Sequence, residues 1–549
     1  MGVKWRRFRT AAGWVAFLAL AAVNLDALIV QWCVPAPPPR PKAPILGESL
    51  RSEGPLRRLG PCWSATHRGQ HVVYLEGDPF TLGYCNSRLL GAVMNRQEQT
   101  LVDKFRELVP LGPLRHLLIR GLMVAYRDLP RRFTEAERLE VLGLASGRED
   151  RFGWLGPTYG RILSYHAIHD ISQALIDNPL FACSAFAASH DRTRDGHTLL
   201  ARNFDFEGGA VFDEDKVVAF VRPDVGFPFV SVAWAGMVGA VSGMNARGIG
   251  VVLNAAASDD RDRTGRPSTL VVRDILQGAG SLGEAIAIVR HSDVLVADLL
   301  TVADGKTGEL AVLEVTPKRV LVRTAADRIV ATNHFLHPDA SRDRKNALRM
   351  RDGTTVARWS RLTELVEAAG PLDPPSAVAI LRDRRGPGGA SRAPGHRGTI
   401  DALIATHSVV FDLTARRLWV SAAPHTLGPF VQYDLDEVLR RGWRDRGALP
   451  PDAMLADGRW DRTQRARALL SRAGQLADDG RHDSAIRLVR EALDLVPDHP
   501  EGLLRLARIC DDAGRPDCAR QGYGAFLAAD PPYRRDADFA RARLAALLP

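Results

Sequence analysis

Two neighbouring stretches of sequence decide the fold: FACSAFA at 181–187 and GHTLLARNFD at 196–205. Apolar residues dominate both stretches and a turn at Asp195-Gly196 separates them, so they predict the two strands of a hairpin. Such a hairpin brings Arg202 and Asp205 back beside Cys183. A nearby guanidinium favours the nucleophilic thiolate form of a cysteine. From these residues alone, Cys183 is either a nucleophile or a buried core cysteine beside a surface Arg–Asp pair.

Further short β-rich runs continue to about residue 430, with two helical pairs among them. The runs lie at 197–204, 217–221, 229–234, 249–253, 298–302, 310–315, 320–323, 408–413 and 418–421. The helical pairs lie at about 269–291 and 357–384. Hairpins interrupted by paired helices predict an α+β fold in which two sheets pack face to face beneath outer helices.

Residues 47–182, which precede this core, are mostly helical in pattern. Apolar side chains recur at three- and four-residue spacing in Gln97–Leu108 and Leu114–Tyr126. A single short strand is predicted at Val72–Glu76. The sequence therefore predicts a largely helical segment before the hairpin.

The carboxy-terminal part of the chain, residues 466–549, contains a repeat with a period of 34 residues. The shift superposes Ala473 on Ala507, Gly480 on Gly514, Ala485 on Ala519, Leu493 on Leu527 and Pro497 on Pro531. This is the tetratricopeptide period, and the alternative is an unrelated four-helix tail. Two repeats bury little core alone, so we expect the module to dock on the neighbouring domain or on a protein partner. Residues 431–465 are predicted to form a linker.

The amino terminus, residues 1–33, has the pattern of an export signal. A basic flank with Lys4, Arg6, Arg7 and Arg9 precedes an uncharged stretch from Thr10 to Leu25. We favour an uncleaved membrane anchor over a cleaved signal peptide; both place the bulk of the protein outside the cytoplasm. Residues 34–46 are rich in proline and predict a stiff extended spacer.

Composition and residue spacing narrow the function further. The chain of 549 residues is 46% hydrophobic and 25% charged, which excludes a disordered or polytopic membrane protein. Its net charge of +9 is spread evenly, without the cluster that nucleic-acid binding requires. His166/His169 and His334/His337 have a metal-compatible spacing, but no matching cysteine or carboxylate set accompanies them. We expect no metal and no cofactor.

Six cysteines are present, without a C-x-x-C pair, so zinc ribbons and thioredoxin motifs are excluded. Cys510 and Cys518 lie on either side of a turn at Gly514, on the two helices of one repeat. That arrangement places their Cα atoms within the ~4.4–6.8 Å that a disulfide needs. An exported protein is also in a compartment where disulfides form. We therefore predict a Cys510–Cys518 disulfide.

A set of motifs in a fixed order resembles a known family. They are YLEGDPF at 74–80 with GY at 83–84, the hairpin around Cys183, GMN at 243–245, GI at 248–249 with LN at 253–254, TNH at 332–334 and SR at 360–361. Together they resemble the N-terminal-nucleophile cysteine hydrolases related to isopenicillin-N (acyl-CoA:6-aminopenicillanic acid) acyltransferase, and more distantly choloylglycine hydrolase. The resemblance covers about 70–430 and implies a four-layer αββα sandwich at 183–430, with 47–182 as its pro-segment. Cys85-Asn86 departs from the Gln-His that the family often has, and the family does not require the tetratricopeptide tail.

The resemblance also implies roles for individual residues. Cys183 would attack the Ala182 carbonyl, and hydrolysis would free an α-amine that serves as general base in later turnover. The other implied roles are Asp205 orienting the amine, Arg202 stabilising the thiolate, Asn254 donating to the oxyanion, and Asn333 and Arg361 supporting the pocket. The alternatives are strand-end residues for Asn254 and Asn333 and a helix-surface charge for Arg361.

The implied reaction is hydrolysis, or transfer to another acceptor, of the acyl group of a small N-acyl substrate through an acyl-cysteine. Export disfavours acyl-CoA as donor, because CoA thioesters are cytoplasmic. Two other functions stay open: a phospholipase-B-like lipid hydrolase, and an inert envelope scaffold that binds partners through its tetratricopeptides.

Overall fold

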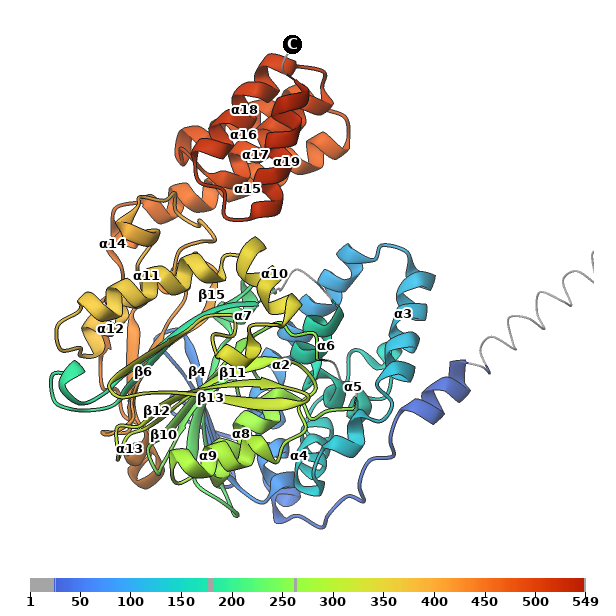
Figure 1. Cartoon of the computed structure of the whole chain (residues 1–549). Helices are drawn as coiled ribbons and strands as arrows, with labels where there is room; N and C mark the ends of the chain where they lie inside the picture. Colours follow the sequence, from blue (N-terminus) through green and yellow to red (C-terminus); the bar gives the residue numbers. More distant parts are fainter. Residues whose placement is uncertain (1–23, 25, 176–180, 261–263, 548–549) are drawn as a thin grey trace, which may run out of the picture.

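The computed structural model describes residues 24, 26–175, 181–260 and 264–547. Two β-sheets lie face to face, helices cover their outer faces, and a separate helical module stands at the carboxy-terminal end (Figure 1). Most of the predicted signal segment, residues 1–33, lies outside the described residues.

The larger sheet has eleven strands in the spatial order β1-β2-β3-β4-β7-β8-β9-β10-β11-β12-β13. Neighbours are antiparallel except for β4 and β7, which are parallel. The strands are β1 (Arg51–Glu53), β2 (Leu56–Leu59), β3 (Cys62–His67), β4 (Gln70–Gly77), β7 (Val217–Pro223), β8 (Phe229–Ala233), β9 (Ser242–Asn245), β10 (Ile249–Ala255), β11 (Asp298–Asp304), β12 (Leu310–Thr316) and β13 (Arg319–Ala325).

The smaller sheet has seven strands in the order β14-β5-β6-β15-β16-β17-β18, all antiparallel. They are β14 (Arg328–Ala331), β5 (Phe181–Ala188), β6 (Leu199–Phe206), β15 (Ala405–Asp412), β16 (Arg417–Ser421), β17 (Phe430–Asp434) and β18 (Ala448–Leu449). The predicted hairpin forms β5 and β6.

Three apolar layers hold the sandwich together. Between the sheets, Val218 and Val252 of the larger sheet pack with Val409 of the smaller one. Helices α2 (Pro79–Leu108), α4 (Glu135–Ser146), α5 (Thr158–Tyr165), α8 (Ser268–Gly278) and α9 (Leu282–Arg290) cover the larger sheet, whereas α11 (Thr355–Ala368) and α12 (Pro374–Leu381) cover the smaller one. The predicted αββα order is therefore confirmed. The remaining helices of the sandwich region are α3 (Gly112–Ala125), α6 (Ile168–Leu175), α7 (Val211–Glu214), α10 (Arg344–Asp352) and α13 (Leu435–Arg441).

The segment before Cys183 contains more β-structure than its sequence predicted. Strands β1–β4 form antiparallel hairpins, and β4 joins the core sheet beside β7. Strands β1 and β2 lack an apolar pattern, because the residues of β1 are exposed and β2 has two arginines at its centre. This segment is therefore an integral part of the larger sheet.

Local chemistry explains the turn from β4 into α2. Gly77 has a φ of +126°, which favours glycine, and the Asp78 carboxylate caps α2 by accepting from the Thr81 N–H at 3.1 Å. Pro79 then begins the helix, where its missing N–H costs nothing. Further along, a Cβ on Gly83 would lie 1.9 Å from the Glu140 carbonyl oxygen, so α2 and α4 approach closely only because glycine is present.

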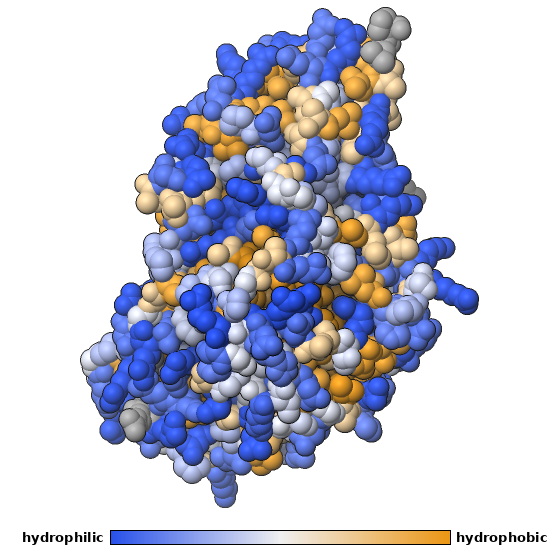
Figure 2. Space-filling model, turned by 60° about the vertical axis from the view of Figure 1, so that its left-hand side comes forward, coloured by the Kyte–Doolittle hydropathy of each residue, from blue (hydrophilic) through white to orange (hydrophobic). Residues whose placement is uncertain are grey.

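The carboxy-terminal module consists of α15 (Arg459–Asp478), α16 (His482–Leu495), α17 (Pro500–Asp512), α18 (Pro516–Ala528) and α19 (Arg534–Ala546), preceded by α14 (Ala453–Ala456). Buried alanines at the repeat positions let the antiparallel helices approach closely. The module docks on the sandwich as expected: His396 hydrogen-bonds the Asp530 carbonyl oxygen at 2.8 Å, and Arg392 pairs with the Asp530 carboxylate. Figure 2 shows a mostly hydrophilic face, with hydrophobic patches on the module and near its junction with the sandwich.

The sandwich extends past residue 430, into the range predicted as a linker. Strand β17 pairs with β16 along its whole length, and Leu435 and Val438 of α13 pack in the core between the sheets. The predicted linker at 431–465 was therefore too long, because β17, α13 and β18 belong to the sandwich.

Among the described residues, no single helix is both long and apolar enough to cross a bilayer. Helices α2 and α3 meet the length and composition criteria only as a pair, and the chain bends by 115° between them.

The predicted disulfide is present, with the Cα atoms of Cys510 and Cys518 5.7 Å apart. We expect alkylation of the denatured protein without reductant to leave both residues unmodified, and alkylation after reduction to modify both. Cys33, which is free, serves as the internal control and should react in both samples. Peptide mass spectrometry reads the result, and alkylation of Cys510 and Cys518 before reduction would contradict the disulfide.

Candidate active site

Cys183 lies near the start of β5 and is completely buried. The β5–β6 register places Cys183 opposite Phe204 and Ala185 opposite Arg202. Because side chains alternate along a strand, Cys183 and Arg202 point to the same face, toward the larger sheet. The hairpin thus brings the thiol and the guanidinium together as predicted.

The guanidinium of Arg202 is held at the thiol by four contacts. One terminal nitrogen donates to the Cys183 Sγ at 3.3 Å and to the Leu253 carbonyl oxygen. The other donates to the Val241 carbonyl oxygen at 2.8 Å and the Ser242 Oγ at 2.6 Å. Burial lowers the pKa of Arg202, and the charge on Cys183 opposes that shift. An arginine keeps its charge in proteins, so a cation lies directly beside the sulfur.

Side chains also bind the main chain of Cys183. Its N–H donates to Asn333 Oδ1 at 2.9 Å, and its carbonyl oxygen accepts from Arg358. Arg358 also donates to Asn333 Oδ1 at 2.7 Å, while the Asn333 Nδ2 donates to the Ala255 carbonyl oxygen at 2.8 Å. The amide of Asn333 is thereby fixed with its oxygen toward the Cys183 nitrogen.

Arg358 is a site residue that the sequence analysis missed, and Arg361 was the wrong arginine of the helix. Arg361 pairs with Asp383 at 2.9 Å and Glu364 at 3.1 Å, away from Cys183. The signal for Arg358 was its place in the buried stripe of α11, which is otherwise made of Thr355, Leu362 and Val366. A charged residue in an apolar helix stripe needs a buried partner.

Asn254 lies close to the Asn333 segment. Its Nδ2 donates to the carbonyl oxygens of Thr332 at 2.9 Å and Ala331 at 3.4 Å. Its Oδ1 is buried without a hydrogen-bond partner among the described residues. In this arrangement Asn254 orients the backbone at 331–332, and its role as an oxyanion donor stays a prediction.

Asp205 lies opposite Ala182 in the β5–β6 register, alongside the Ala182–Cys183 peptide bond. Burial raises the pKa of its carboxyl group to about 7, although the positive charges of Arg358 and Arg397 act in the opposite direction. Its Oδ1 has no hydrogen-bond partner in the described part of the chain. Because side chains alternate along a strand, the Asp205 side chain points to the face of the smaller sheet opposite the Cys183 thiol. The hairpin therefore brings Arg202 to the thiol, but the expectation that it brings the Asp205 carboxyl group there as well is wrong.

His166 and His334, one from each of the two histidine pairs, make hydrogen bonds within the fold. His166 bonds the Ile162 carbonyl oxygen and the Val238 N–H, each at 2.8 Å, so both ring nitrogens are used. His334 contacts the Thr355 Oγ1 at 2.8 Å, and burial lowers its pKa to about 4. The side chain of His169 lies outside the described set. Asp195, His197 and Asp412 come close enough to share a cation. The first two lie in the turn before β6 and Asp412 ends β15, away from Cys183.

An apolar cluster continues from the thiol toward the surface. Phe204 packs beside Cys183, and Trp234 and Met237 contact the same cluster while partly exposed. The Phe204 and Trp234 ring centroids are 5.5 Å apart.

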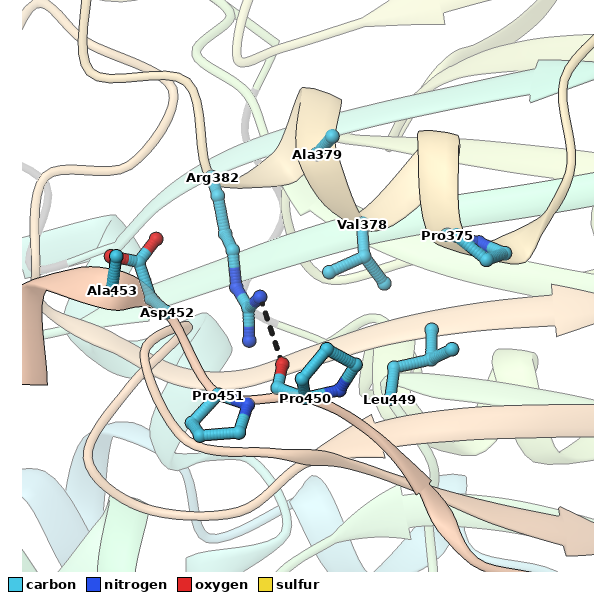
Figure 3. A pocket seen from close by; sticks show the side chains of 9 residues that line it. All are labelled: Pro375, Val378, Ala379, Arg382, Leu449, Pro450, Pro451, Asp452 and Ala453. Atoms are coloured by element: carbon cyan, nitrogen blue, oxygen red, sulfur yellow. Dashed lines mark hydrogen bonds between the residues drawn. The ribbon is translucent and has the colours of Figure 1, made fainter. Parts of the chain in front are cut away.

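Figure 3 shows a different pocket, at the edge between α12 and β18, where Arg382 donates to the Pro450 carbonyl oxygen at 3.1 Å. Its arginine donates to the carbonyl oxygens of Thr426, Pro450 and Gly428 and so joins the loops that these residues belong to.

The architecture defines the class: this is an N-terminal-nucleophile hydrolase sandwich joined to a tetratricopeptide module. Residues 192–425 match the family described as acyl-coenzyme A:6-aminopenicillanic acid acyl-transferase. Residues 476–547 match a tetratricopeptide repeat. Both predictions are confirmed, and the acyltransferase match begins shortly after Cys183.

Individual relatives are distant. The chain is 26% identical over 424 residues to an uncharacterized protein of Archaeoglobus fulgidus, covering 69% of this chain and 68% of that one. It is 23% identical over 272 residues to protein dcd1B of Dictyostelium discoideum, covering 45% of this chain and 50% of that protein. Two solved structures are also similar. A Caenorhabditis elegans ortholog of N-acylethanolamine-hydrolyzing acid amidase is 16% identical (42% of this chain, 93% of that chain, TM-score 0.33). A mutant conjugated bile acid hydrolase from Clostridium perfringens is 14% identical (46% and 93%, TM-score 0.34).

The raised pKa of Asp205 predicts a pH-dependent stability. Between its ordinary pKa of 3.8 and about 7, the folded state holds a proton that the unfolded state releases. The free energy of unfolding contributed by this group therefore falls as the pH rises through that window. We expect Asp205→Asn to remove this loss, so that the melting temperature of the variant relative to the parent increases from pH 4 to pH 7.

Asp191→Asn, at an exposed position, is the matched control and should show no such trend. If the difference in melting temperature between Asp205→Asn and the parent is the same at every pH, the raised pKa of Asp205 is contradicted.

Proposed function

We propose that this protein is a self-processing cysteine amidohydrolase or acyltransferase that acts on an N-acyl substrate through an acyl-Cys183 intermediate. The observation that carries the proposal is the set of buried groups around one residue: Arg202 at its thiol, Asn333 at its N–H and Arg358 at its carbonyl oxygen. A cysteine that only fills the core requires none of these charged and amide partners.

Self-processing would begin with attack of the Cys183 thiolate on the carbonyl carbon of Ala182. The peptide C–N bond breaks, the nitrogen takes up a proton, and the acyl group passes to sulfur as a thioester. Water then hydrolyses the thioester, releasing the Ala182 carboxylate and the free thiol. Asp205, which is opposite Ala182 in the β5–β6 register, is proposed to orient the α-amine that this cleavage frees.

In turnover, the new α-amine of Cys183 would act as general base. Its ordinary pKa of about 7.7–8 suits that role. Asn333 Oδ1, which now accepts from the Cys183 N–H, is in place to accept from the amine. The thiolate attacks the substrate carbonyl, the amine of the substrate leaves with a proton, and water or another acceptor then takes the acyl group from sulfur. Asn254 is the proposed oxyanion donor, a role that requires one of its N–H groups to leave its carbonyl partner.

The substrate class follows from the surroundings of the thiol. The apolar cluster of Phe204, Trp234 and Met237 adjoins Cys183 and reaches the surface, so an acyl chain would be held there. We propose that the protein is exported and held at the membrane by its amino-terminal segment, which separates it from cytoplasmic acyl-CoA. Hydrolysis of an N-acyl compound is therefore favoured over synthesis.

We expect the active protein to consist of two fragments, the second beginning at Cys183. Cys183→Ala should remain a single chain because the attacking sulfur is absent. Intact-mass spectrometry and amino-terminal sequencing measure the outcome. An active preparation that remains one chain would overturn the N-terminal-nucleophile mechanism.

A panel of N-acyl electrophiles of different chain length should label Cys183 in the processed protein. Release of fatty acid from a phospholipid, without cleavage of N-acyl amides, would favour the phospholipase-B-like alternative. An unprocessed chain that takes up no label would favour the scaffold.

Two arginines of α11 provide a matched pair for the site. Arg358→Gln removes the contacts to Cys183 and Asn333, and we expect it to slow fragment formation by on the order of 100-fold through misplacement of the scissile bond. Arg361→Gln removes only pairs with Glu364 and Asp383, so processing should keep its normal rate. Thermal melting monitored by circular dichroism establishes that both variants are folded. Equal processing rates in the two variants would contradict the role of Arg358.

A further inference from the structure

The large exposed apolar side chains of the described residues are concentrated on α3 and the turn that leads into it from α2. Fourteen such residues are present among the described residues, and six of them lie within residues 108–124. These six are Leu108, Leu111, Leu114, Leu117, Leu118 and Val124. Monomeric proteins rarely expose a contiguous apolar surface of this kind unless it binds something.

Helix α3 is amphipathic, but it exposes its apolar face and buries an arginine, the opposite of what a helix at a water-facing surface does. Leu114, Leu117 and Leu118 follow the three- and four-residue spacing of one helix face, and Leu117 is 67% exposed. Arg120, by contrast, is only 8% exposed and pairs with Asp26 at 2.6 Å. The helix therefore anchors itself to the protein through a salt bridge and directs its leucines outward.

The amino-terminal helix, which includes residues 26–33, extends this surface. Asp26 binds both Arg120 and His116 of α3, and Arg127 lies over the exposed Trp32 ring at 4.4 Å. Figure 1 shows this helix and α3 on the same side of the molecule. Asp26, which follows the uncharged sequence Thr10–Leu25, is thus in contact with α3.

The charge around the leucine face is positive. Residues 104–132 contain seven lysines or arginines and two acidic residues. Arg120 is buried and paired with Asp26, and the basic residues still outnumber the acidic ones when that pair is left out. An amphipathic helix with leucines on one side and basic residues nearby is suited to the interface of a bilayer that contains anionic lipids.

We propose that the leucine face of α3 lies in the interfacial region of an anionic bilayer, as a second membrane contact beside the amino-terminal segment. The contact is peripheral: the leucines enter the boundary between headgroups and acyl chains, and α3 lies along the surface. The inference uses the proposed anchor only to say which surface the chain approaches, and it stands without self-processing.

The test uses the full chain with Cys183→Ala, which removes the reactive thiol and keeps one polypeptide. A polarity-sensitive fluorophore is attached through Leu117→Cys, and through Val225→Cys as the matched control, since Val225 is 77% exposed in a turn far along the chain. The protein without an introduced cysteine gives the labelling background. Vesicles contain phosphatidylcholine alone or equimolar phosphatidylcholine and phosphatidylglycerol, with or without nitroxide-labelled lipid.

The expected result is a blue shift of the Leu117→Cys probe with vesicles, strong quenching by the nitroxide lipid, and a larger effect with phosphatidylglycerol. When vesicles are added, the emission of the Val225→Cys probe should stay the same as in buffer. Equal emission from the two probes in vesicles would overturn the membrane contact. A blue shift before vesicles are added would also overturn it, because the face would then be covered by a second copy or by the chain itself. Because the sample cannot self-process, either failure leaves the proposed function untouched.

Discussion

The buried guanidinium of Arg202 joins the two sheets at the point where the chemistry is proposed. It belongs to β6 of the smaller sheet, yet it donates to Leu253 of the larger sheet and to Val241, just before β9 of that sheet, as well as to Cys183. A buried cation is costly unless its donors are satisfied, so the sheets must meet in one register to supply those oxygens. The same constraint holds the thiol against a positive charge. Sandwich packing and the environment of the sulfur therefore depend on one side chain.

The sequence revealed the parts of the site that are local or that lie in recognisable motifs. Cys183 and Arg202 fall on one hairpin, and hairpin register follows directly from the alternation of side chains. Asn333 was found only because its segment resembles a family motif, since 150 residues separate it from Cys183, its hydrogen-bond partner. Arg358 was missed because helix periodicity places it among core positions, where only a distant partner explains an arginine. Strands β1 and β2 were missed because exposed and charged residues hide their pattern.

The segment before Cys183 is bound into the fold both by strand pairing and by helix packing. Strand β4 supplies the parallel neighbour of β7, and α2 contributes buried residues to the outer core of the larger sheet. Gly83 and Gly143 allow α2 and α4 to approach so closely that added side chains would collide with the facing backbone. If the chain is cut at Ala182, the two fragments therefore remain joined by a continuous sheet and a shared core.

The contacts around Cys183 also set an order of events during synthesis. The partners of its N–H and carbonyl oxygen, Asn333 and Arg358, follow it by 150 and 175 residues. A chain still being made carries the cysteine for a long interval without either partner. Contacts of such large sequence separation form late, because the entropy of closing the loop must be overcome first. The groups that surround the Cys183 sulfur are therefore complete only after the whole sandwich has been synthesised and folded.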